Sequence, residues 1–335
     1  MKLALLEHLS IGKHYNMKVS VLGCGRWGTF ISWYLSNHNH KVCQWGRENS
    51  QIFNNLATTR KNEYVSLDEK VLLTNDLDKA IEHAEVIIIS ISSQGLRGLM
   101  EQIVKRDVSR KIFLLCMKGV ELDTGKRLTQ VVQDFGVSKE KIAVWVGPGH
   151  IQAFTQGLPN CMLIDSDNKK LTKFLADSFR SELIRFYYGD DLIGSEIGAA
   201  AKNVMGIAAG MLDGGGYTTL KGPLMARGAR EIARLIKALG GNELSAYGLC
   251  HLGDYETTLF SPYSNNRKFG EDFVKGIPFK KLAEGVSTAK ALKELGDKYN
   301  VDLPITNAVY SILYNNADPM SEFLHLFSRS SRKEF

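Results

Sequence analysis

The sequence predicts an α/β fold, in which a doubly wound sheet is followed by an all-α C-terminal domain. Three observations carry this prediction. A glycine-rich turn lies between a short apolar strand pattern and a helical pattern near the start of the chain. Further apolar runs of strand length recur up to residue 188, and helical periodicity dominates from residue 192 onward. The length of 335 residues fits two domains.

The glycine-rich turn follows the strand pattern at 18–22 and precedes the helical pattern at 29–35. Gly23 allows a tight turn, Gly25 lets backbone N–H groups approach a pyrophosphate, and Gly28 lets helix and strand pack closely. In this context the motif predicts a Rossmann-type dinucleotide-binding domain, the alternative being a plain glycine turn in another α/β protein. The expected cofactor contacts in the turn are Gly23, Gly25, Arg26, Trp27 and Gly28.

The second strand pattern, at 40–45, is followed by Gly46 and Arg47. NAD-selective enzymes usually carry an acid here to hold the ribose 2′-hydroxyl, and this strand end has none. A guanidinium suits a 2′-phosphate, so we expect NADP(H) to be preferred and NAD(H) to be possible. The alternative is a solvated loop arginine.

Later strand patterns place several segments at the carboxyl edge of the sheet, where ligands bind. Lys118 follows the apolar run 111–116 and is a candidate site residue, the alternative being a surface lysine. His150 follows the run 141–146 in a Gly/Pro loop, where a structural role is favoured over catalysis. The remaining predicted strands are 84–91, 161–164 and 183–188, and residues 51–80 receive no assignment.

The domain limits follow from these patterns. Met17 begins the first strand directly, so residues 1–16 are interpreted as an N-terminal extension or a misplaced start. Residues 17–190 form the predicted Rossmann domain, and residues 191–335 form the predicted helical domain.

The helical pattern at 192–212 contains small residues at every fourth position, with a lysine among them. These residues are Gly194, Gly198, Lys202, Gly206 and Gly210. Each helical glycine costs about 1 kcal/mol relative to alanine, so close backbone packing, or room for a small substrate, must compensate. Burial would lower the pKa of Lys202 toward neutrality, which favours a catalytic acid–base role over that of a snorkelling surface lysine.

Other candidates follow in the helical half. Asp254 is interpreted as a partner of Lys202, with a helix-cap aspartate as the alternative. A helix from Pro223 to Leu239 carries three arginines, Arg227, Arg230 and Arg234, interpreted as a polar face. The turn at 261–270 brings amide and basic donors together, which suits a phosphate. Helices are also expected after Glu284 and from Pro304 to about Asn315.

Composition narrows the class of protein. The net charge of +6 is modest, and no basic run is interleaved with aromatic residues, which favours a small anionic ligand over nucleic acid. No apolar stretch is long enough to span a membrane, and no metal-ligand spacing occurs. The five cysteines form no C-x-x-C pair, so we expect reduced thiols in a cytoplasmic protein.

Taken together, the motifs appear in the order typical of NAD(P)-dependent glycerol-3-phosphate dehydrogenases, and the chain resembles this family over nearly its whole length after Met17. The matching segments are 23–29, 45–47, 118–121, 147–148, 196–204, 252–254, 264–270 and 283–285.

The resemblance implies a Rossmann domain followed by an all-helical domain, a homodimer, and reversible reduction of dihydroxyacetone phosphate to sn-glycerol 3-phosphate for glycerophospholipid synthesis. It implies Lys202 as proton donor, with Lys118 and Asp254 as further catalytic residues. Further implied cofactor contacts are Arg47, Lys118, Asn265 and Glu284. Implied substrate contacts are Lys118, Gly147, Gly149, Asn203, Asp254, Thr258, Ser264, Asn265, Asn266 and Arg267.

Two positions depart from the family pattern. Asn265 stands where an arginine is usual, and Arg267 or Lys268 is expected to take over its phosphate contact. Gly149 stands where a serine or threonine is usual, which removes a hydroxyl. A reductase of another small keto substrate, such as ketopantoate, and a non-catalytic NADPH-binding sensor are therefore the alternative functions.

Overall fold

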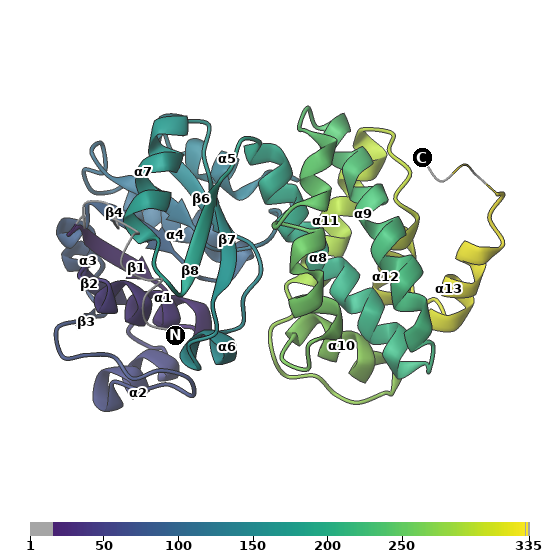
Figure 1. Ribbon diagram of the computed structural model, residues 1–335, viewed down its shortest axis with the longest axis horizontal. Coiled ribbons are helices and arrows are strands. Elements are labelled where there is room, and N and C mark those ends of the chain that lie inside the picture. The colour runs from purple at the N-terminus through teal and green to yellow at the C-terminus, as the bar shows by residue number, and fades with distance from the viewer. Residues whose placement is uncertain (1–15, 332, 334–335) are drawn as a thin grey trace, which may run out of the picture.

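The computed structural model describes residues 16–331 and residue 333. The predicted N-terminal extension lies outside these residues, apart from Asn16. The described chain forms two lobes, with the sheet in the N-terminal lobe and a bundle of helices in the other (Figure 1).

The N-terminal lobe is built on an eight-stranded sheet with the order β3-β2-β1-β4-β5-β6-β7-β8. Its neighbouring strands pair in parallel except for β6 and β7, which pair antiparallel. The strands are β1 (Lys18–Leu22), β2 (Lys41–Trp45), β3 (Leu72–Thr74), β4 (Val86–Ile89), β5 (Ile112–Leu115), β6 (Ile142–Val146), β7 (Asn160–Asp165) and β8 (Ile184–Tyr188). The predicted doubly wound sheet is confirmed.

Helices cover both faces of the sheet, which explains why β4 reads as an unbroken apolar run. Val86 and Ile88 face one apolar cluster, whereas Ile87 and Ile89 face the other. The helices of this lobe are α1 (Arg26–Asn37), α2 (Gln51–Thr59), α3 (Leu77–His83), α4 (Leu96–Ile103), α5 (Leu128–Gln133), α6 (Ile151–Thr155) and α7 (Lys169–Phe179).

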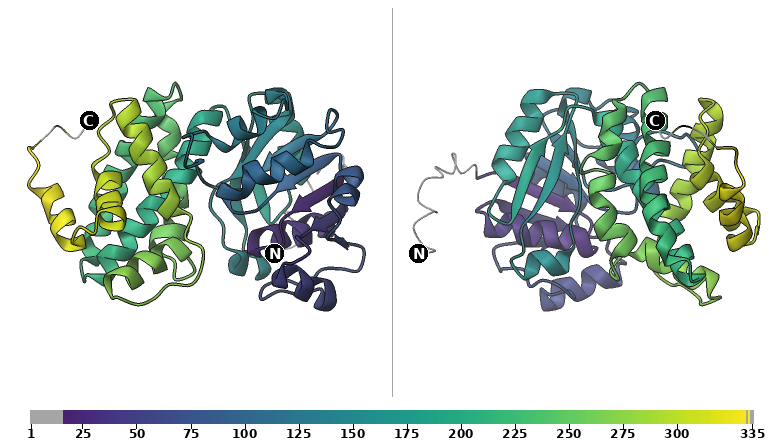
Figure 2. Two further views of the ribbon diagram at one scale, coloured as in Figure 1. Left: turned by 180° about the vertical axis from the view of Figure 1, so that it is seen from behind. Right: turned by 45° about the vertical axis from the view of Figure 1, so that its right-hand side comes forward.

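The helical lobe is organised around α8 (Leu192–Gly214), which is almost wholly buried. Its other helices are α9 (Lys221–Ala238), α10 (Asn265–Val274), α11 (Gly285–Lys298), α12 (Pro304–Tyr314) and α13 (Pro319–Phe327). α13 lies at the outer end of this lobe, away from the sheet (Figures 1 and 2). The predicted all-α second part is confirmed.

The glycine stripe of α8 serves close packing. A Cβ on Gly210 would lie 1.8 Å from the carbonyl oxygen of Arg267, and one on Gly206 would lie 2.8 Å from the methyl group of Thr258. The compensation for the helical glycines is therefore contact with α10 and the segment before it. The idea that the bare face leaves room for a substrate is wrong at these positions, because protein atoms fill the space.

The two lobes are joined by shared core and buried polar contacts. Leu192 and Cys250 belong to the apolar cluster on the α3–α5 face of the sheet. The Glu196 carboxylate of α8 accepts hydrogen bonds from the backbone N–H (2.9 Å) and hydroxyl (2.6 Å) of Thr129 at the start of α5. It also pairs with Arg127. The helical lobe is thus fixed to the sheet rather than tethered by a linker.

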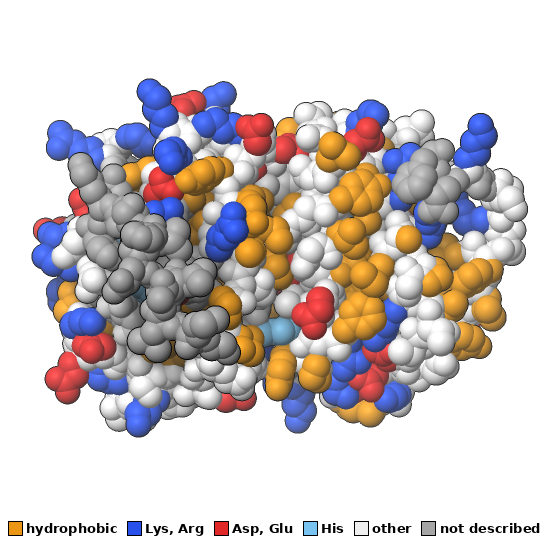
Figure 3. All heavy atoms as spheres, viewed as in Figure 1, with side chains coloured by type: hydrophobic (Ala, Val, Ile, Leu, Met, Phe, Trp, Pro, Cys, Tyr) orange, Lys and Arg blue, Asp and Glu red, His pale blue; other side chains and the backbone are white. Residues whose placement is uncertain are grey.

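The surface and the remaining sequence expectations can be stated briefly. On the face shown in Figure 3, lysine and arginine side chains are dispersed among acidic and apolar ones. Among the described helices, none is both long and apolar enough to cross a membrane. The five cysteines are free thiols, four of them buried.

Candidate active site

Lys202 projects from the middle of α8 into a buried polar cluster. The residue is 8 % exposed, and its Nζ lies 2.7 Å from the hydroxyl oxygen of Thr258 and 3.0 Å from Oδ2 of Asp254. Burial lowers the pKa of Lys202 to about 8, because the attraction of Asp254 does not offset the lost hydration and the repulsion from Lys118. Lys202 is therefore positioned and tuned to exchange a proton near neutral pH.

Lys118 reaches the same carboxylate from the other lobe. It follows the carboxyl end of β5, and its Nζ donates to Oδ2 of Asp254 at 2.7 Å and to the carbonyl oxygen of Gly147 at 2.8 Å. Gly147 has φ +118°, and a Cβ there would lie 3.1 Å from the Cα of Met162. A glycine is thus required where this carbonyl turns toward Lys118.

Asp254 is the centre of the cluster. Its side chain is 1 % exposed. Burial alone would raise the pKa of Asp254, but the ammonium groups of Lys118 and Lys202 lower it below the ordinary aspartate value. The Thr257 hydroxyl also donates to it. With both lysines protonated, two cations share one carboxylate, so the cluster carries a net positive charge next to the domain junction.

A buried histidine anchors the segment that carries Asp254. His251 Nδ1 lies 2.8 Å from the carbonyl oxygen of Gly198, and its Nε2 lies 2.6 Å from the hydroxyl of Tyr255. Burial lowers the pKa of His251 to about 4, so the ring is neutral and donates to Gly198 while accepting from Tyr255. This residue was not among the predicted site residues, and its position just before Leu252–Asp254 was the available signal.

A chain of side-chain amides continues from the cluster. Asn203 donates to the carbonyl oxygen of Lys118 at 3.2 Å and accepts from Asn266 at 3.0 Å. Asn266 in turn accepts from the backbone N–H of Gly285 at 2.9 Å. Both predicted asparagines therefore lie beside the lysines, with their amides oriented by neighbouring groups.

The glycine-rich turn has the geometry that a pyrophosphate requires. Gly23 has φ +123°, and Cβ atoms on Gly23 and Gly28 would lie 2.1 Å from the carbonyl oxygens of Ser90 and Gly23. A Cβ on Gly25, by contrast, would meet nothing within 4 Å. Gly25 is exposed at the N-terminus of α1, which has neither a side-chain cap nor an acidic residue in its first turn. Uncapped N–H groups and open space fit a dinucleotide phosphate.

The other predicted cofactor residues lie around this sheet edge. Trp27 stacks on Phe30 with ring centroids 5.0 Å apart, and Arg47 is exposed in the loop after β2. Glu284 accepts from the backbone N–H of Ser93 at 3.1 Å and from its hydroxyl at 2.5 Å. Ser93, in the polar turn that follows the predicted strand at 84–91, thus ties this turn to the helical lobe.

A cavity of about 700 Å³, here called the junction cavity, lies between the lobes. The nucleotide-binding lobe contributes Arg26 and Tyr64, and the helical lobe contributes Asn265 and Lys268. Asn265 also donates to the carbonyl oxygen of Leu282 at 3.2 Å. Cationic side chains at this cavity are Arg26, Lys268, Lys280 and Lys281, and acidic ones are Glu63 and Asp272, so cations predominate. A phosphate group fits this set by charge.

Three predicted substrate contacts have other partners. Arg267 is held by the Asp213 carboxylate at 2.7 Å and by the carbonyl oxygen of Ser261 at 3.1 Å, so its guanidinium is engaged within the helical lobe. The hydroxyl of Ser264, which lines the junction cavity, caps α10 by accepting from the backbone N–H of Arg267. A Cβ on Gly149 would lie 2.5 Å from the Phe154 ring, so this glycine makes room for an aromatic side chain.

His150, for which the sequence favours a structural role over catalysis, lies against a residue of the junction cavity. Its ring packs edge-on against Tyr263, with centroids 5.7 Å apart, and Tyr263 lines the junction cavity. Burial lowers the pKa of His150, and the Lys202 ammonium lowers it further against the opposing effect of Asp254. The His150 ring thus lies against the cavity wall, and its environment disfavours the protonated form.

The family models and the curated relatives that match this chain all name the same enzyme family. Family models described as the N-terminus and the C-terminus of NAD-dependent glycerol-3-phosphate dehydrogenase match residues 18–172 and 191–323. The chain is 33 % identical over 332 residues to a glycerol-3-phosphate dehydrogenase [NAD(P)+] of Chlorobium phaeobacteroides, covering 95 % of this chain and 99 % of the relative. It is 32 % identical over 330 residues to the enzyme of that name from Thermoanaerobacter, with the same two coverages.

A solved structure agrees with these relatives. The glycerol-3-phosphate dehydrogenase of Coxiella burnetii superposes with a TM-score of 0.86 at 25 % identity, covering 94 % of this chain and 99 % of that one. Since both family models and full-length relatives match, the chain belongs to the NAD-dependent glycerol-3-phosphate dehydrogenase family and is an NAD(P)-dependent oxidoreductase.

Proposed function

We propose that the protein reduces dihydroxyacetone phosphate to sn-glycerol 3-phosphate with NAD(P)H, and that the reaction is reversible. The observation that carries the proposal is the shared carboxylate of Asp254, which holds two lysines from opposite lobes at one point. The relatives named glycerol-3-phosphate dehydrogenase [NAD(P)+] support the substrate and the cofactor class. The alternatives, ketopantoate reduction and cofactor sensing without turnover, are not favoured, because both family models match.

In this mechanism Lys202 supplies the proton. When bound, the nicotinamide cofactor supplies the hydride that reduces C2 of the substrate. Negative charge then develops on the former carbonyl oxygen, and the Lys202 ammonium stabilises this charge and donates a proton to the oxygen. One proton and one hydride convert the ketone to the secondary alcohol. In the reverse direction the neutral Lys202 amine accepts the proton.

Lys118 and Asp254 prepare that step. Lys118 keeps a second positive charge beside the reacting oxygen, while Asp254 fixes both ammonium groups and limits the fall in the pKa of Lys202. Thr258, which accepts from Lys202, holds the amine in one orientation. Loss of one proton neutralises the cluster, which favours transfer toward an anionic oxygen.

The proposed phosphate contacts compensate for the arginine that the family usually has at the position of Asn265. We assign the phosphate to the junction cavity, with Asn265, Lys268 and Arg26 as its polar partners. Lys268 pairs with Asp272 at 2.8 Å and is about half exposed, so it can turn toward a ligand. Gly147, Asn203 and Thr258 remain proposed contacts nearer the reacting carbon, and Asn266 remains a proposed ligand of the substrate phosphate.

For the cofactor we propose a preference for NADP(H), with Arg47 as the partner of the 2′-phosphate. A guanidinium binds phosphate bidentately. The Arg47→Ala variant is expected to lose about tenfold or more in kcat/KM with NADPH and little with NADH. An equal loss with both cofactors, or none with either, would remove Arg47 from this role.

The remaining proposals concern the protein's setting. We propose a homodimer in the cytoplasm that supplies glycerol 3-phosphate for glycerophospholipid synthesis. The domain division at residues 190 and 191 belongs to the same proposal, since β8 ends at Tyr188 and α8 begins at Leu192.

The deciding experiment is NADPH oxidation with dihydroxyacetone phosphate beside ketopantoate. We expect turnover with the phosphorylated ketone and at most trace turnover with ketopantoate. Turnover of ketopantoate alone would replace the substrate, and tight NADPH binding without turnover of either ketone would favour the sensor.

A further inference from the structure

Both oxygen partners of Lys202 belong to one short segment of the helical lobe. Asp254 and Thr258, whose oxygens lie 3.0 and 2.7 Å from the Lys202 ammonium, both lie within residues 251–260. Lys202 itself belongs to α8. The geometry around the amine therefore depends on where this segment lies along α8. His251, the first residue of the segment, is hydrogen-bonded in both directions.

The His251 side chain binds the turn of α8 that leads to Lys202. Its Nδ1 lies 2.8 Å from the carbonyl oxygen of Gly198. Gly198 precedes Lys202 by four residues, and in an α-helix such a carbonyl also accepts from the backbone N–H four residues later. The ring therefore contacts the same backbone group that holds the main chain of Lys202. A Cβ on Gly198 would lie 3.1 Å from the Cβ of His251, so the glycine lets the two segments approach closely.

The backbone of His251 binds Asp254 directly. The His251 carbonyl oxygen accepts from the backbone N–H of Asp254 at 3.0 Å. One residue thus joins the helix turn before Lys202, through its side chain, to the carboxylate partner of Lys202, through its main chain. The preceding residue makes a similar contact, since the thiol of Cys250 lies 3.6 Å from the carbonyl oxygen of Gly194, one turn earlier in α8.

Tyr255 fixes the ring of His251. Its hydroxyl lies 2.6 Å from Nε2, and the two rings meet edge-to-face with centroids 4.8 Å apart. Both residues are 0 % exposed. Burial lowers the pKa of His251 to about 4, so the ring is neutral and carries one proton. Because the carbonyl oxygen of Gly198 only accepts, that proton lies on Nδ1, and the tyrosine hydroxyl donates to Nε2.

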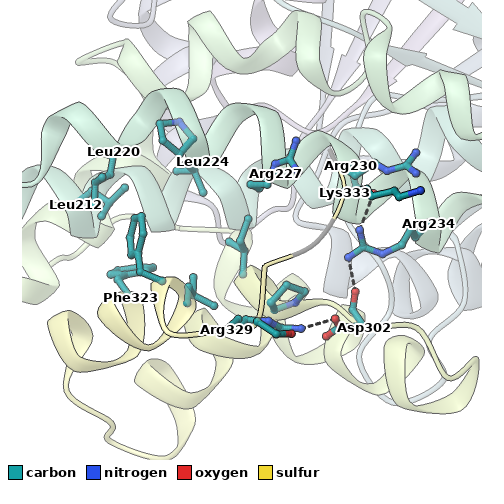
Figure 4. A pocket seen from close by; sticks show the side chains of 16 residues that line it. Leu212, Leu220, Leu224, Arg227, Arg230, Arg234, Asp302, Phe323, Arg329 and Lys333 are labelled. Carbon is teal, nitrogen blue, oxygen red and sulfur yellow. Dashed lines mark hydrogen bonds and ion pairs between the residues drawn. The ribbon is translucent and has the colours of Figure 1, made fainter. Parts of the chain in front are cut away.

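The hydroxyl of Tyr255 lies against the inner face of α9. A Cβ on Gly228 would lie 3.1 Å from this hydroxyl oxygen, so the glycine leaves room for it. The outer face of α9 carries three arginines, which the sequence indicated as a polar face. They line a cavity of about 490 Å³ at the outer end of the helical lobe (Figure 4), and are Arg227, Arg230 and Arg234. The support of Tyr255 thus comes from the side of α9 opposite this cavity.

We propose that His251 is a positioning residue, which sets the distance between Lys202 and Asp254 by bridging α8 to the backbone of the aspartate. The inference rests on the proposed function, in which Lys202 exchanges a proton with the substrate oxygen. The buried ring acts through the two residues that it aligns. Without the bridge the segment 251–260 can shift along α8, and a displacement of about 1 Å at a reacting group costs on the order of 100-fold in rate.

Three variants test the bridge in steady-state reduction of dihydroxyacetone phosphate with NADPH. His251→Leu removes both side-chain hydrogen bonds and should lower kcat about 10–100-fold, with KM changed less than about threefold. His251→Asn keeps an N–H donor near the place of Nδ1 and should recover about threefold or more of that loss. Tyr255→Phe removes only the hydroxyl and should lower kcat about threefold to tenfold.

The two side chains should behave as one unit. The double variant His251→Leu/Tyr255→Phe should have the kcat of His251→Leu within about twofold, because the tyrosine acts through the ring. Tyr34→Phe is the matched control, since Tyr34 is also 0 % exposed and its hydroxyl donates to the carbonyl oxygen of Phe179 at 2.5 Å in the other lobe. It should lower the melting temperature much as Tyr255→Phe does and leave kcat within about twofold of wild type.

A measurement without turnover separates this proposal from the proposed function. The pKa of Lys202 can be followed by NMR of protein isotopically labelled at lysine Cε and assigned with Lys202→Met. Asp254 raises this pKa, and Lys118 lowers it. Poorer alignment with the carboxylate should therefore lower the pKa of Lys202 in His251→Leu, and lower it less in His251→Asn. Tyr34→Phe should leave it unchanged.

Two results would overturn the proposal. One is a kcat within about threefold of wild type in both His251→Leu and Tyr255→Phe. The other is an equal loss of kcat in His251→Leu and His251→Asn with an unchanged pKa of Lys202. Either would make His251 a residue that only stabilises the fold.

Two further outcomes are decided by the same set of variants. If the wild type does not reduce dihydroxyacetone phosphate, the proposed function fails, and the pKa of Lys202 in the variants still decides whether His251 aligns the cluster. If His251→Leu does not fold, the difference in kcat between Tyr255→Phe and Tyr34→Phe decides, because both variants keep their rings and lose one buried hydroxyl.

Discussion

Two aspartates, Asp254 beside α8 and Asp213 near the end of α8, have the same type of partners in different places. Asp254 pairs with Lys118 and Lys202, and Asp213 pairs with Lys221 at 2.6 Å and with Arg267 at 2.7 Å. In both sites burial would raise the aspartate pKa, and the two cations lower it below its ordinary value. The charged partners and the direction of the pKa shift are therefore the same for both aspartates and do not tell which one belongs to the candidate active site.

Their positions in the fold separate them. Asp213, Lys221 and Arg267 all belong to the helical lobe, where they join the end of α8 to α9 and α10. The Asp254 cluster instead takes Lys118 from the nucleotide-binding lobe and lies where the lobes meet. One triad fastens helices, whereas the other gathers two ammonium groups at the junction of the lobes. The comparison predicts that substitutions in the Asp254 triad lower activity, whereas substitutions in the Asp213 triad lower stability.

The largest expected effect is on turnover when Lys202 is removed. Lys202→Ala should lower kcat for reduction about 10³–10⁴-fold, because both the proton donor and a charge beside the developing alkoxide are lost. Steady-state kinetics with NADPH and dihydroxyacetone phosphate measure this, and circular dichroism checks the fold.

The matched variant in the other triad is Lys221→Met, which removes an equally buried ammonium group. It should lower the melting temperature and leave kcat within about threefold of wild type. Comparable losses of kcat in the two variants would show that both triads act through stability alone.

The second prediction concerns the pH at which reduction declines. Reduction needs protonated Lys202, so kcat/KM should fall as pH rises through about 8, and the reverse oxidation should rise over the same range. Asp254→Asn removes the carboxylate that raises this pKa. The fall should then begin at lower pH, with kcat near pH 7 reduced about 100-fold. An unchanged pH profile in this variant would exclude Asp254 as the group that tunes Lys202.

The sequence predicted the two lobes well because their signals are local. Val86–Ile89, the centre of the predicted run at 84–91, is apolar throughout since both faces of β4 are covered. Residues 51–80 received no assignment because β3 has three residues, none of them buried, and α2 buries only Phe53 and Leu56. Such short elements depend on their neighbours more than on their own pattern.

For the candidate site, the sequence predicted that Lys202 and Asp254 are partners, but it did not predict how Lys118 and Arg267 are placed by the packing of the lobes and helices. Asp254 was interpreted as a charge-assisted hydrogen-bond partner of Lys202, and this pairing is present in the structure. That Lys118 shares the same carboxylate depends on how the lobes dock, which no local pattern encodes. Arg267 was expected at the substrate because it lies in a donor-rich turn. Its partner Asp213, 54 residues away in the sequence, becomes visible only when α8 and α10 pack together.

The third prediction is a loss of stability with little loss of activity. Asp213→Asn leaves the buried Lys221 and the partly buried Arg267 with a neutral partner and should lower the free energy of unfolding by about 2 kcal/mol at pH 7. The pKa of folded Asp213 is lowered, so its stabilisation is complete above the ordinary aspartate pKa of about 3.9 and is lost as pH falls through the folded value.

The difference between wild type and Asp213→Asn in urea unfolding should therefore shrink below about pH 4, while kcat at pH 7 stays within about threefold. A constant difference across this pH range would mean that the charge of Asp213 contributes nothing and that only its shape matters.

The smallest expected effects come from two glycines one turn apart in α8, Gly206 facing the Thr258 partner of Lys202 and Gly210 facing the backbone of Arg267. A Cβ on Gly210 would lie 1.8 Å from the backbone carbonyl of Arg267, so Gly210→Ala must push α10 away, at a loss of about 1–2 kcal/mol in stability. A Cβ on Gly206 would meet the Thr258 methyl group at 2.8 Å, and that side chain can turn. Turning it moves the hydroxyl that accepts from Lys202.

Gly206→Ala should therefore keep more stability than Gly210→Ala yet lower kcat about threefold to tenfold. Urea unfolding and steady-state kinetics on both variants give the comparison. If Gly206→Ala were the less stable of the two and had wild-type kcat, the packing of Thr258 would be structural, and the orientation of Lys202 would rest on Asp254 alone.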